Sequence, residues 1–172
     1  MKNNHIVSIC QGCNLEAPTL EGPTHPYLLS SASCWDLYSK ILEKEYSNPE
    51  YMVVHRLTVD AYCAQHPGEP NPKSIQSINV HLVGLFLVLE RQLKPEFARK
   101  VIGIITNHFK TELNWIEPTF PLGEINVSHV VLAKTAEEHR ELVYKWAKEV
   151  WAAWGHTHEK ISELAERGIQ LS

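Results

Sequence analysis

The sequence lacks a hydrophobic run long enough to cross a membrane. Its longest apolar stretch, residues 82–89, is interrupted by Gly84 and falls far short of the roughly twenty residues that a transmembrane helix needs. The first ten residues contain only a short apolar run, and the small-residue cleavage site of a secretory signal peptide does not follow. We therefore expect a cytoplasmic protein that has no membrane partner.

The sequence also lacks an excess of positive charge. Its 16 Lys and Arg residues are outnumbered by 20 Asp and Glu residues, which gives a formal charge of −4 over 172 residues. Because duplex nucleic acids and anionic membranes are recognised by strongly basic surfaces, we expect no nucleic-acid partner. The partner that this composition leaves open is a small molecule or another protein, and the sequence does not identify it.

Several motifs that would name a reaction are missing. The chain has no P-loop, no G-x-G-x-x-G, no G-x-S-x-G and no H-E-x-x-H. Their absence argues against the NTPases, dinucleotide enzymes, serine hydrolases and zinc proteases that carry these motifs. Whether the protein is an enzyme therefore stays open at this stage.

Sustained strand-like alternation is missing as well, and apolar residues recur instead at helical spacing. We predict an all-α fold, a single domain over residues 1–172, in which a bundle of about five helices (residues 31–168) carries an irregular N-terminal arm (residues 1–30). Ser33, Ser74 and Thr135 are the predicted N-caps of three helices, and the last helix is predicted to be long, with a buried tryptophan stripe. The predicted helices cover residues 33–46, 58–66, 74–90, 95–109 and the segment from 135 to beyond 164.

Cysteine is scarce, but two of the four cysteines form a Cys-x-x-Cys pair, Cys10 and Cys13. In a reducing compartment thiols are metal ligands or buried groups rather than disulfides. Two sulfurs on one turn supply half of a tetrahedral zinc shell, and His25 and Cys34 lie at a plausible spacing to complete it. We predict zinc as the cofactor. A redox pair is disfavoured because no βαβ pattern is present, and two unpaired thiols in a loose arm are the remaining alternative.

Histidine is abundant, with ten residues in the chain. His66, His81 and His158 are predicted on the inward faces of three helices, the arrangement from which metal sites in helical bundles are built. His55 and Asp60 are candidates to orient an imidazole of such a second site. The alternative is that each histidine is an ordinary hydrogen-bonded residue of the core or its boundary.

Five segments follow one another in the chain: the Cys-x-x-Cys pair, GPTHPY, SCWxxY, HRLTVDAYxxQHPG and QSxxVHL. Together they resemble a family of uncharacterised bacterial proteins, and the resemblance covers roughly residues 10–160. It implies no activity. Cys63 lies where the family has a small apolar residue, which counts against Cys63 as a ligand. The family pattern includes Cys10, Cys13, His25, Cys34, His55, Asp60, His66 and His81.

Two functions follow from these patterns. The first is a small cytoplasmic zinc-binding protein whose metal ties the N-terminal arm to the bundle and which acts by binding a partner or ligand. The second is a metal-dependent helical-bundle enzyme, a hydrolase or transferase, that uses the inward histidines. A closed, thiolate-rich metal shell favours the first function, whereas a histidine-rich shell with an open position favours the second.

Overall fold

The structure, a computed structural model, describes residues 6–172, so the first five residues of the predicted arm lie outside the described residues. Within this range the chain is mainly helical, as predicted, with eight α-helices in place of about five. In chain order the elements are β1 (Val7–Ile9), β2 (Glu16–Pro18), α1 (Ala32–Ser47), α2 (Pro49–Met52), α3 (His55–Gln65), α4 (Pro72–Leu89), α5 (Pro95–His108), η1 (Lys110–Glu112), α6 (Val127–Val130), α7 (Ala136–Ala153), η2 (Gly155–Thr157) and α8 (His158–Gln170).

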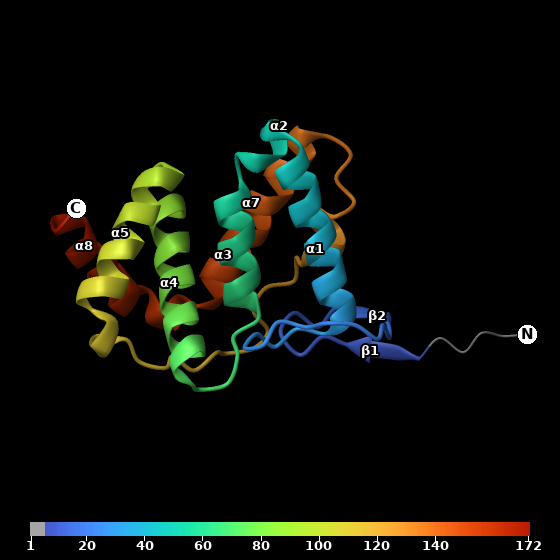
Figure 1. Cartoon of the computed structure of the whole chain (residues 1–172), viewed down its shortest axis with the longest axis horizontal. Coiled ribbons are helices and arrows are strands. Elements are labelled where there is room, and N and C mark those ends of the chain that lie inside the picture. Colours follow the sequence, from blue (N-terminus) through green and yellow to red (C-terminus); the bar gives the residue numbers. More distant parts are fainter. Residues whose placement is uncertain (1–5) are drawn as a thin grey trace, which may run out of the picture.

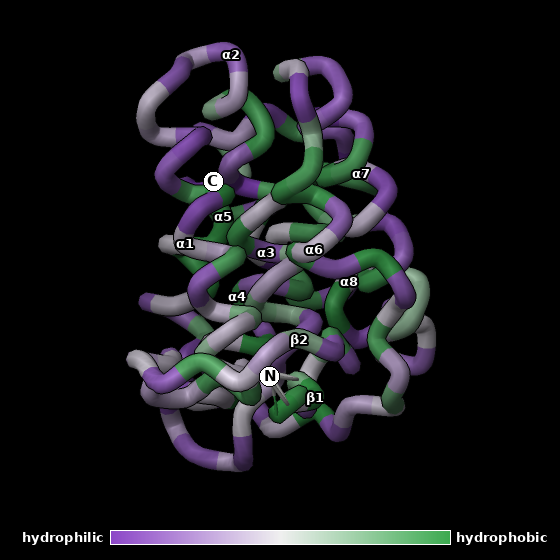
Figure 2. The backbone as a smooth tube through the Cα atoms, turned by 90° about the vertical axis from the view of Figure 1, so that its right-hand side faces the viewer, coloured by the Kyte–Doolittle hydropathy of each residue, from purple (hydrophilic) through white to green (hydrophobic). Residues whose placement is uncertain are grey.

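Helices α3 and α4 lie side by side in the middle of the molecule (Figure 1). Helix α7 packs on α3, and α5 and α8 pack on α4 and on each other. Helix α1 lies on the side of α3 that faces away from α4, and it also contacts α2 and α6. In Figure 2 the hydrophobic stretches lie largely among these helices. Much of the chain at the top and at the bottom of that view is hydrophilic.

Helix α4 has the length and composition of a membrane span, but it is a core helix here. Just over half of its residues, 56%, are buried within the molecule, and it contacts four other helices. A central helix covered by neighbours on several sides is expected to be apolar over most of its circumference. Its hydropathy is therefore explained by its place in the core.

The prediction of one long C-terminal helix is wrong in one respect, because the chain forms two helices there, α7 and α8. The break follows Trp154, whose fully buried indole donates a hydrogen bond to the carbonyl oxygen of Ala64 in α3 (3.0 Å). Gly155, a poor helix former, then begins the 3₁₀ turn η2. Trp146, Trp151 and Trp154 are all buried, as the stripe predicted.

The helix starts are shifted toward the N-terminus at two of the three predicted caps. Ser31 rather than Ser33 caps α1, and Asn71 rather than Ser74 caps α4. Thr135 caps α7 as predicted, and its hydroxyl accepts a hydrogen bond from the amide of Glu138 (3.1 Å). Each cap satisfies amide groups that have no partner within the helix.

The predicted irregular arm contains a short antiparallel hairpin. Strand β1 pairs with β2 so that Ser8 lies opposite Ala17. Strands of three residues are too short to give a periodic sequence signal. The hydroxyl of Ser33 in α1 donates a hydrogen bond to the carbonyl oxygen of Pro18 (2.6 Å), and this bond holds the hairpin against the start of α1.

Candidate metal centre

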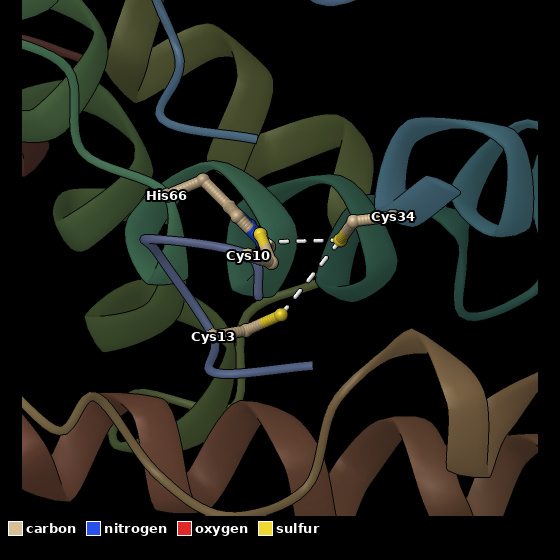
Figure 3. A group of neighbouring side chains, drawn as sticks. All are labelled: Cys10, Cys13, Cys34 and His66. Carbon is tan, nitrogen blue, oxygen red and sulfur yellow. Dashed lines mark hydrogen bonds between the residues drawn. The ribbon is translucent and has the colours of Figure 1, made fainter. Parts of the chain in front are cut away.

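Three separate segments bring four metal-binding side chains together. Cys10 and Cys13 come from the turn between β1 and β2, Cys34 from the first turn of α1, and His66 from the end of α3 (Figure 3). Their three sulfurs and one ring nitrogen all lie within 4.8 Å of one another. All four residues are buried, and Cys10, Cys34 and His66 are 0% exposed. A buried group of three cysteines and one histidine is a common zinc-binding set.

The hairpin turn orients the first two cysteines. The amide of Cys10 donates to the carbonyl oxygen of Leu15 (2.9 Å), and the carbonyl oxygen of Cys10 accepts from the amide of Asn14 (2.9 Å). Asn14 has a φ of 57°, in the left-handed region that asparagine tolerates better than most residues. The chain therefore reverses within a few residues, and both sulfurs face the same side of the turn.

Gly12 allows this turn to lie directly on the end of α3. A Cβ atom at Gly12 would be 2.4 Å from Cδ2 of His66 and less than 3 Å from the carbonyl oxygens of Leu29 (2.7 Å) and Gln65 (2.9 Å). Distances this short are steric overlaps, and two of the three contacts are with backbone atoms. Only glycine fits here without displacing the His66 ring or the turn itself.

Cys34 is positioned by the cap of α1. The Ser31 side chain accepts a hydrogen bond from the amide of Cys34 (3.2 Å), which fixes the first turn of the helix. The sulfur of Cys34 then lies 3.7 Å from that of Cys13 and 3.3 Å from Nε2 of His66. The Tyr62 hydroxyl donates to the same sulfur at 3.7 Å. Cys34 is thus at the centre of the group.

His66 is oriented by its own helix. Its Nδ1 lies 2.7 Å from the carbonyl oxygen of Tyr62. Because a carbonyl oxygen only accepts, Nδ1 carries the hydrogen and Nε2 keeps its lone pair. Nε2 is the nitrogen that faces Cys34. A backbone acceptor on the second ring nitrogen is the usual way in which proteins orient a metal-binding histidine.

The spacing of the sulfurs fits a tetrahedral zinc shell. Zinc–sulfur bonds of about 2.3 Å at tetrahedral angles place two sulfurs about 3.8 Å apart. Cys13 and Cys34 are separated by 3.7 Å. This pair of sulfurs therefore already has the separation of two zinc ligands, and all four donor atoms lie within 4.8 Å of one another.

The thiols strongly influence one another's ionisation. Hydrogen bonding from Cys13 and then Cys34 lowers the pKa of Cys10 far below the usual cysteine value. The interaction with Cys10 raises the pKa of Cys13 to about 12 and also raises that of Cys34. Three thiolates this close repel one another, and a bound dication is the group that removes this repulsion.

His25, the fourth ligand proposed from the sequence, lies outside the group. Its ring packs edge-on against Tyr27 (4.3 Å between centroids) and Trp35 (5.3 Å), and its Nδ1 accepts from the amide of Tyr27 (3.4 Å). His66 occupies the fourth position instead. The Pro-Gly pair after His66 predicts that a helix ends there, but it does not indicate that His66 is a ligand.

The three histidines proposed for a second metal site do not meet. His66 belongs to the cysteine group. The Nδ1 of His81 donates to the buried carboxylate of Asp60 (2.8 Å). His158 stacks on Trp151 (3.8 Å between centroids) and bonds the carbonyl oxygen of the same residue through Nε2 (2.8 Å). His81 and His158 thus act as hydrogen-bonded residues of the core boundary.

His55 belongs to a cluster that the sequence analysis missed. Its Nδ1 donates to the fully buried carboxylate of Glu45 in α1 (2.7 Å). The same carboxylate accepts from Nε2 of His139 in α7 (2.8 Å) and from the Thr58 hydroxyl in α3 (2.5 Å). A single acidic residue in an amphipathic helix gives no sequence signal of burial, and its partners are up to 94 residues away.

Comparison with known proteins identifies a family that covers most of the chain. A family model described as a family of unknown function (DUF5946) matches residues 8–155. That range contains all four residues of the cysteine and histidine group. No curated protein and no solved structure matches the chain.

Proposed function

The chain belongs to DUF5946, a family of unknown function, so we propose its function from the chemistry of the site: it binds one zinc ion through Cys10, Cys13, Cys34 and His66. The observation that carries this proposal is the meeting of four buried donor atoms, from three distant segments, within 4.8 Å of one another. Thiolates with one imidazole favour zinc over the hard cations magnesium and calcium.

The ion has a structural role in this proposal. Three thiolates and one imidazole fill a tetrahedral shell and leave no open position for a substrate. The ligands join the hairpin turn to the ends of α1 and α3, so the ion ties the N-terminal arm to the helices. Reduced thiols fit the cytoplasm, and function then comes from binding a small molecule or protein partner on the surface that the ion stabilises.

No specific observation favours the alternative function, a metal-dependent helical-bundle enzyme. A catalytic site built on His66, His81 and His158 would need their free nitrogens to converge on one point. His66 faces the cysteines, and each of the other two is engaged by a separate partner. We therefore propose one function only.

The test is metal content combined with protection of the arm from protease. We expect about one zinc per wild-type chain and none in the Cys10→Ser/Cys13→Ser variant. Cys63→Ser is the matched control, because Cys63 lies outside the group, and it should keep its zinc. Removal of zinc by a chelator should expose residues 14–31 to cleavage while the helices stay resistant. A double variant that retains full zinc would refute the proposed ligand set.

A further inference from the structure

A second candidate site lies beside the N-terminal half of α4, outside the metal centre. It is a pocket of about 270 Å³, and the part of α4 that lines it is the lower part of this helix in Figure 1. Its polar lining is rich in hydrogen-bond donors and contains no acidic side chain. The lining residues are Tyr27 from the arm, Pro72, Lys73, Gln76, Ser77, Val80 and His81 from α4, and Lys110 from η1.

His81 is held rigidly at the wall of this pocket. Its Nδ1 donates to Oδ1 of Asp60 (2.8 Å), and Arg56 donates to Oδ2 of the same carboxylate (2.6 Å). Asp60 is 0% exposed, and it fits against α4 because Gly84 has no side chain: a Cβ there would lie 2.1 Å from Oδ2. With Nδ1 engaged by Asp60, the His81 ring is fixed in place where it lines the pocket.

The charge around the pocket is positive. Burial lowers the pKa of His81, but the charge of Cys63 and the hydrogen bond with Asp60 outweigh it and raise the pKa to about 10. The Asp60 carboxylate is shared between His81 and Arg56, and Cys63 adds a second negative charge near His81 when it is ionised, so the positive charge of the pocket comes chiefly from Lys73 and Lys110. Burial and then the nearby charge of His81 lower the pKa of His25.

We propose that this pocket binds the phosphate group of a small organic phosphate, through His81, Lys73 and Lys110. A phosphate monoester has close to two negative charges and three terminal oxygens at neutral pH. Three cationic donors with an amide and hydroxyls beside them match that group better than they match a carboxylate, which has one charge and two oxygens. The remaining volume accommodates only a small organic part.

The experiment is a calorimetric titration of the zinc-loaded protein with inorganic phosphate and with glycerol phosphate. We expect saturable binding of both and weaker binding of acetate at the same ionic strength. The Lys73→Gln/Lys110→Gln variant should bind glycerol phosphate at least about tenfold more weakly, because two charged hydrogen bonds are lost. The matched control is Lys94→Gln/Lys145→Gln, which removes two exposed lysines outside the pocket and should bind as the wild type does.

A histidine variant separates ligand binding from folding. His81→Asn retains a donor that can reach Asp60 but removes the charge and Nε2. We expect its thermal melting to resemble that of the wild type and its phosphate affinity to fall. Equal affinity in the wild type and the double-lysine variant, or acetate binding as tight as phosphate binding, would overturn the proposal. Neither result would affect the zinc site, since none of its ligands lines this pocket.

Discussion

Gly12 is the residue on which the geometry of the metal centre depends most closely. Gly12→Ala would place a methyl group 2.4 Å from the His66 ring and 2.7 Å from a backbone oxygen, so the turn must move away from α3. We expect weaker zinc binding in a competition assay with a chelator, together with a lower melting temperature. Gly22→Ala is the control, because no atom lies within 4 Å of a Cβ at Gly22. Equal zinc affinity in the two variants would contradict this packing.

The identity of the fourth ligand is tested by two histidine variants. His66→Ala removes the nitrogen that lies 3.3 Å from the Cys34 sulfur, whereas His25→Ala removes a ring packed on Tyr27 and Trp35. Because the loss of a partner outside the shell already costs metal affinity about 10–100-fold, loss of the ligand itself should cost more. We expect His66→Ala to lose zinc and His25→Ala to retain it. The reverse outcome would restore the ligand set read from the sequence.

For single residues, the sequence could predict three of the four members of the cysteine and histidine group, but not His66. Cys10 and Cys13 are close in the chain, and Cys34 is one of only two further cysteines. His66 lies 32 residues beyond Cys34, and its approach depends on how α3 packs against α1. Local spacing does not contain that information, and His25 was the nearer histidine in the chain.

Between elements, the contact of α3 with α4 contains a buried charge that needs partners. His81→Leu would leave the Asp60 carboxylate with Arg56 as its only remaining side-chain partner among the described residues. Because an unsatisfied buried acceptor is costly, we expect a loss of roughly 1–3 kcal/mol of unfolding free energy. Denaturant unfolding measures it, and His81→Asn should recover most of the loss. A His81→Leu variant as stable as the wild type would show that the hydrogen bond contributes nothing.

Glu45 lies where α1, α3 and α7 meet, and we expect its ionisation to make the stability of the protein depend on pH. Burial raises the pKa of Glu45, but hydrogen bonds from His139, His55 and Thr58 outweigh it and lower the pKa below the usual glutamate value. A lowered pKa in the folded state means that the contribution to stability is complete above the unfolded value of about 4.3 and is lost as the pH falls through the folded value.

The measurement is denaturant unfolding of the wild type and of Glu45→Gln between pH 7 and pH 3. Both proteins lose any bound metal in acid, so the difference between them isolates the carboxylate. We expect the wild type to be more stable at pH 7 and the difference to shrink as the pH falls below about 4. A difference that stays constant over this range would rule out ionised Glu45 as the cause.

Helical spacing predicted the helices reliably, but it did not predict where they begin and end. The periodic residues of α1, α3, α4, α5 and α7 predicted those helices, because each buries one face against a neighbour. The break after Trp154 is set by a tertiary hydrogen bond to Ala64, and the short strands are set by the docking of the hairpin on α1. Both depend on contacts between distant parts of the chain.

For the whole molecule, the candidate metal centre brings together the hairpin turn, the start of α1 and the end of α3. Strand β1 of the hairpin leaves Val7 and Ile9 more than half exposed. Besides the hydrogen bond from Ser33, the contacts of the hairpin with the helices are made by Leu15 and the two buried cysteines of the turn, and Ala17 packs against the core. Metal binding that orders a segment contributes directly to the folding free energy of that segment.

X-ray absorption at the zinc edge of the purified protein tests the central claim most directly. The structure predicts a four-coordinate shell of about three sulfurs near 2.3 Å and one nitrogen at about 2.0–2.1 Å. The sulfur contribution should fall in a Cys34→His variant, provided that it still binds the metal. A wild-type shell dominated by nitrogen and oxygen would contradict the account, and so would a protein that binds no zinc when its thiols are reduced.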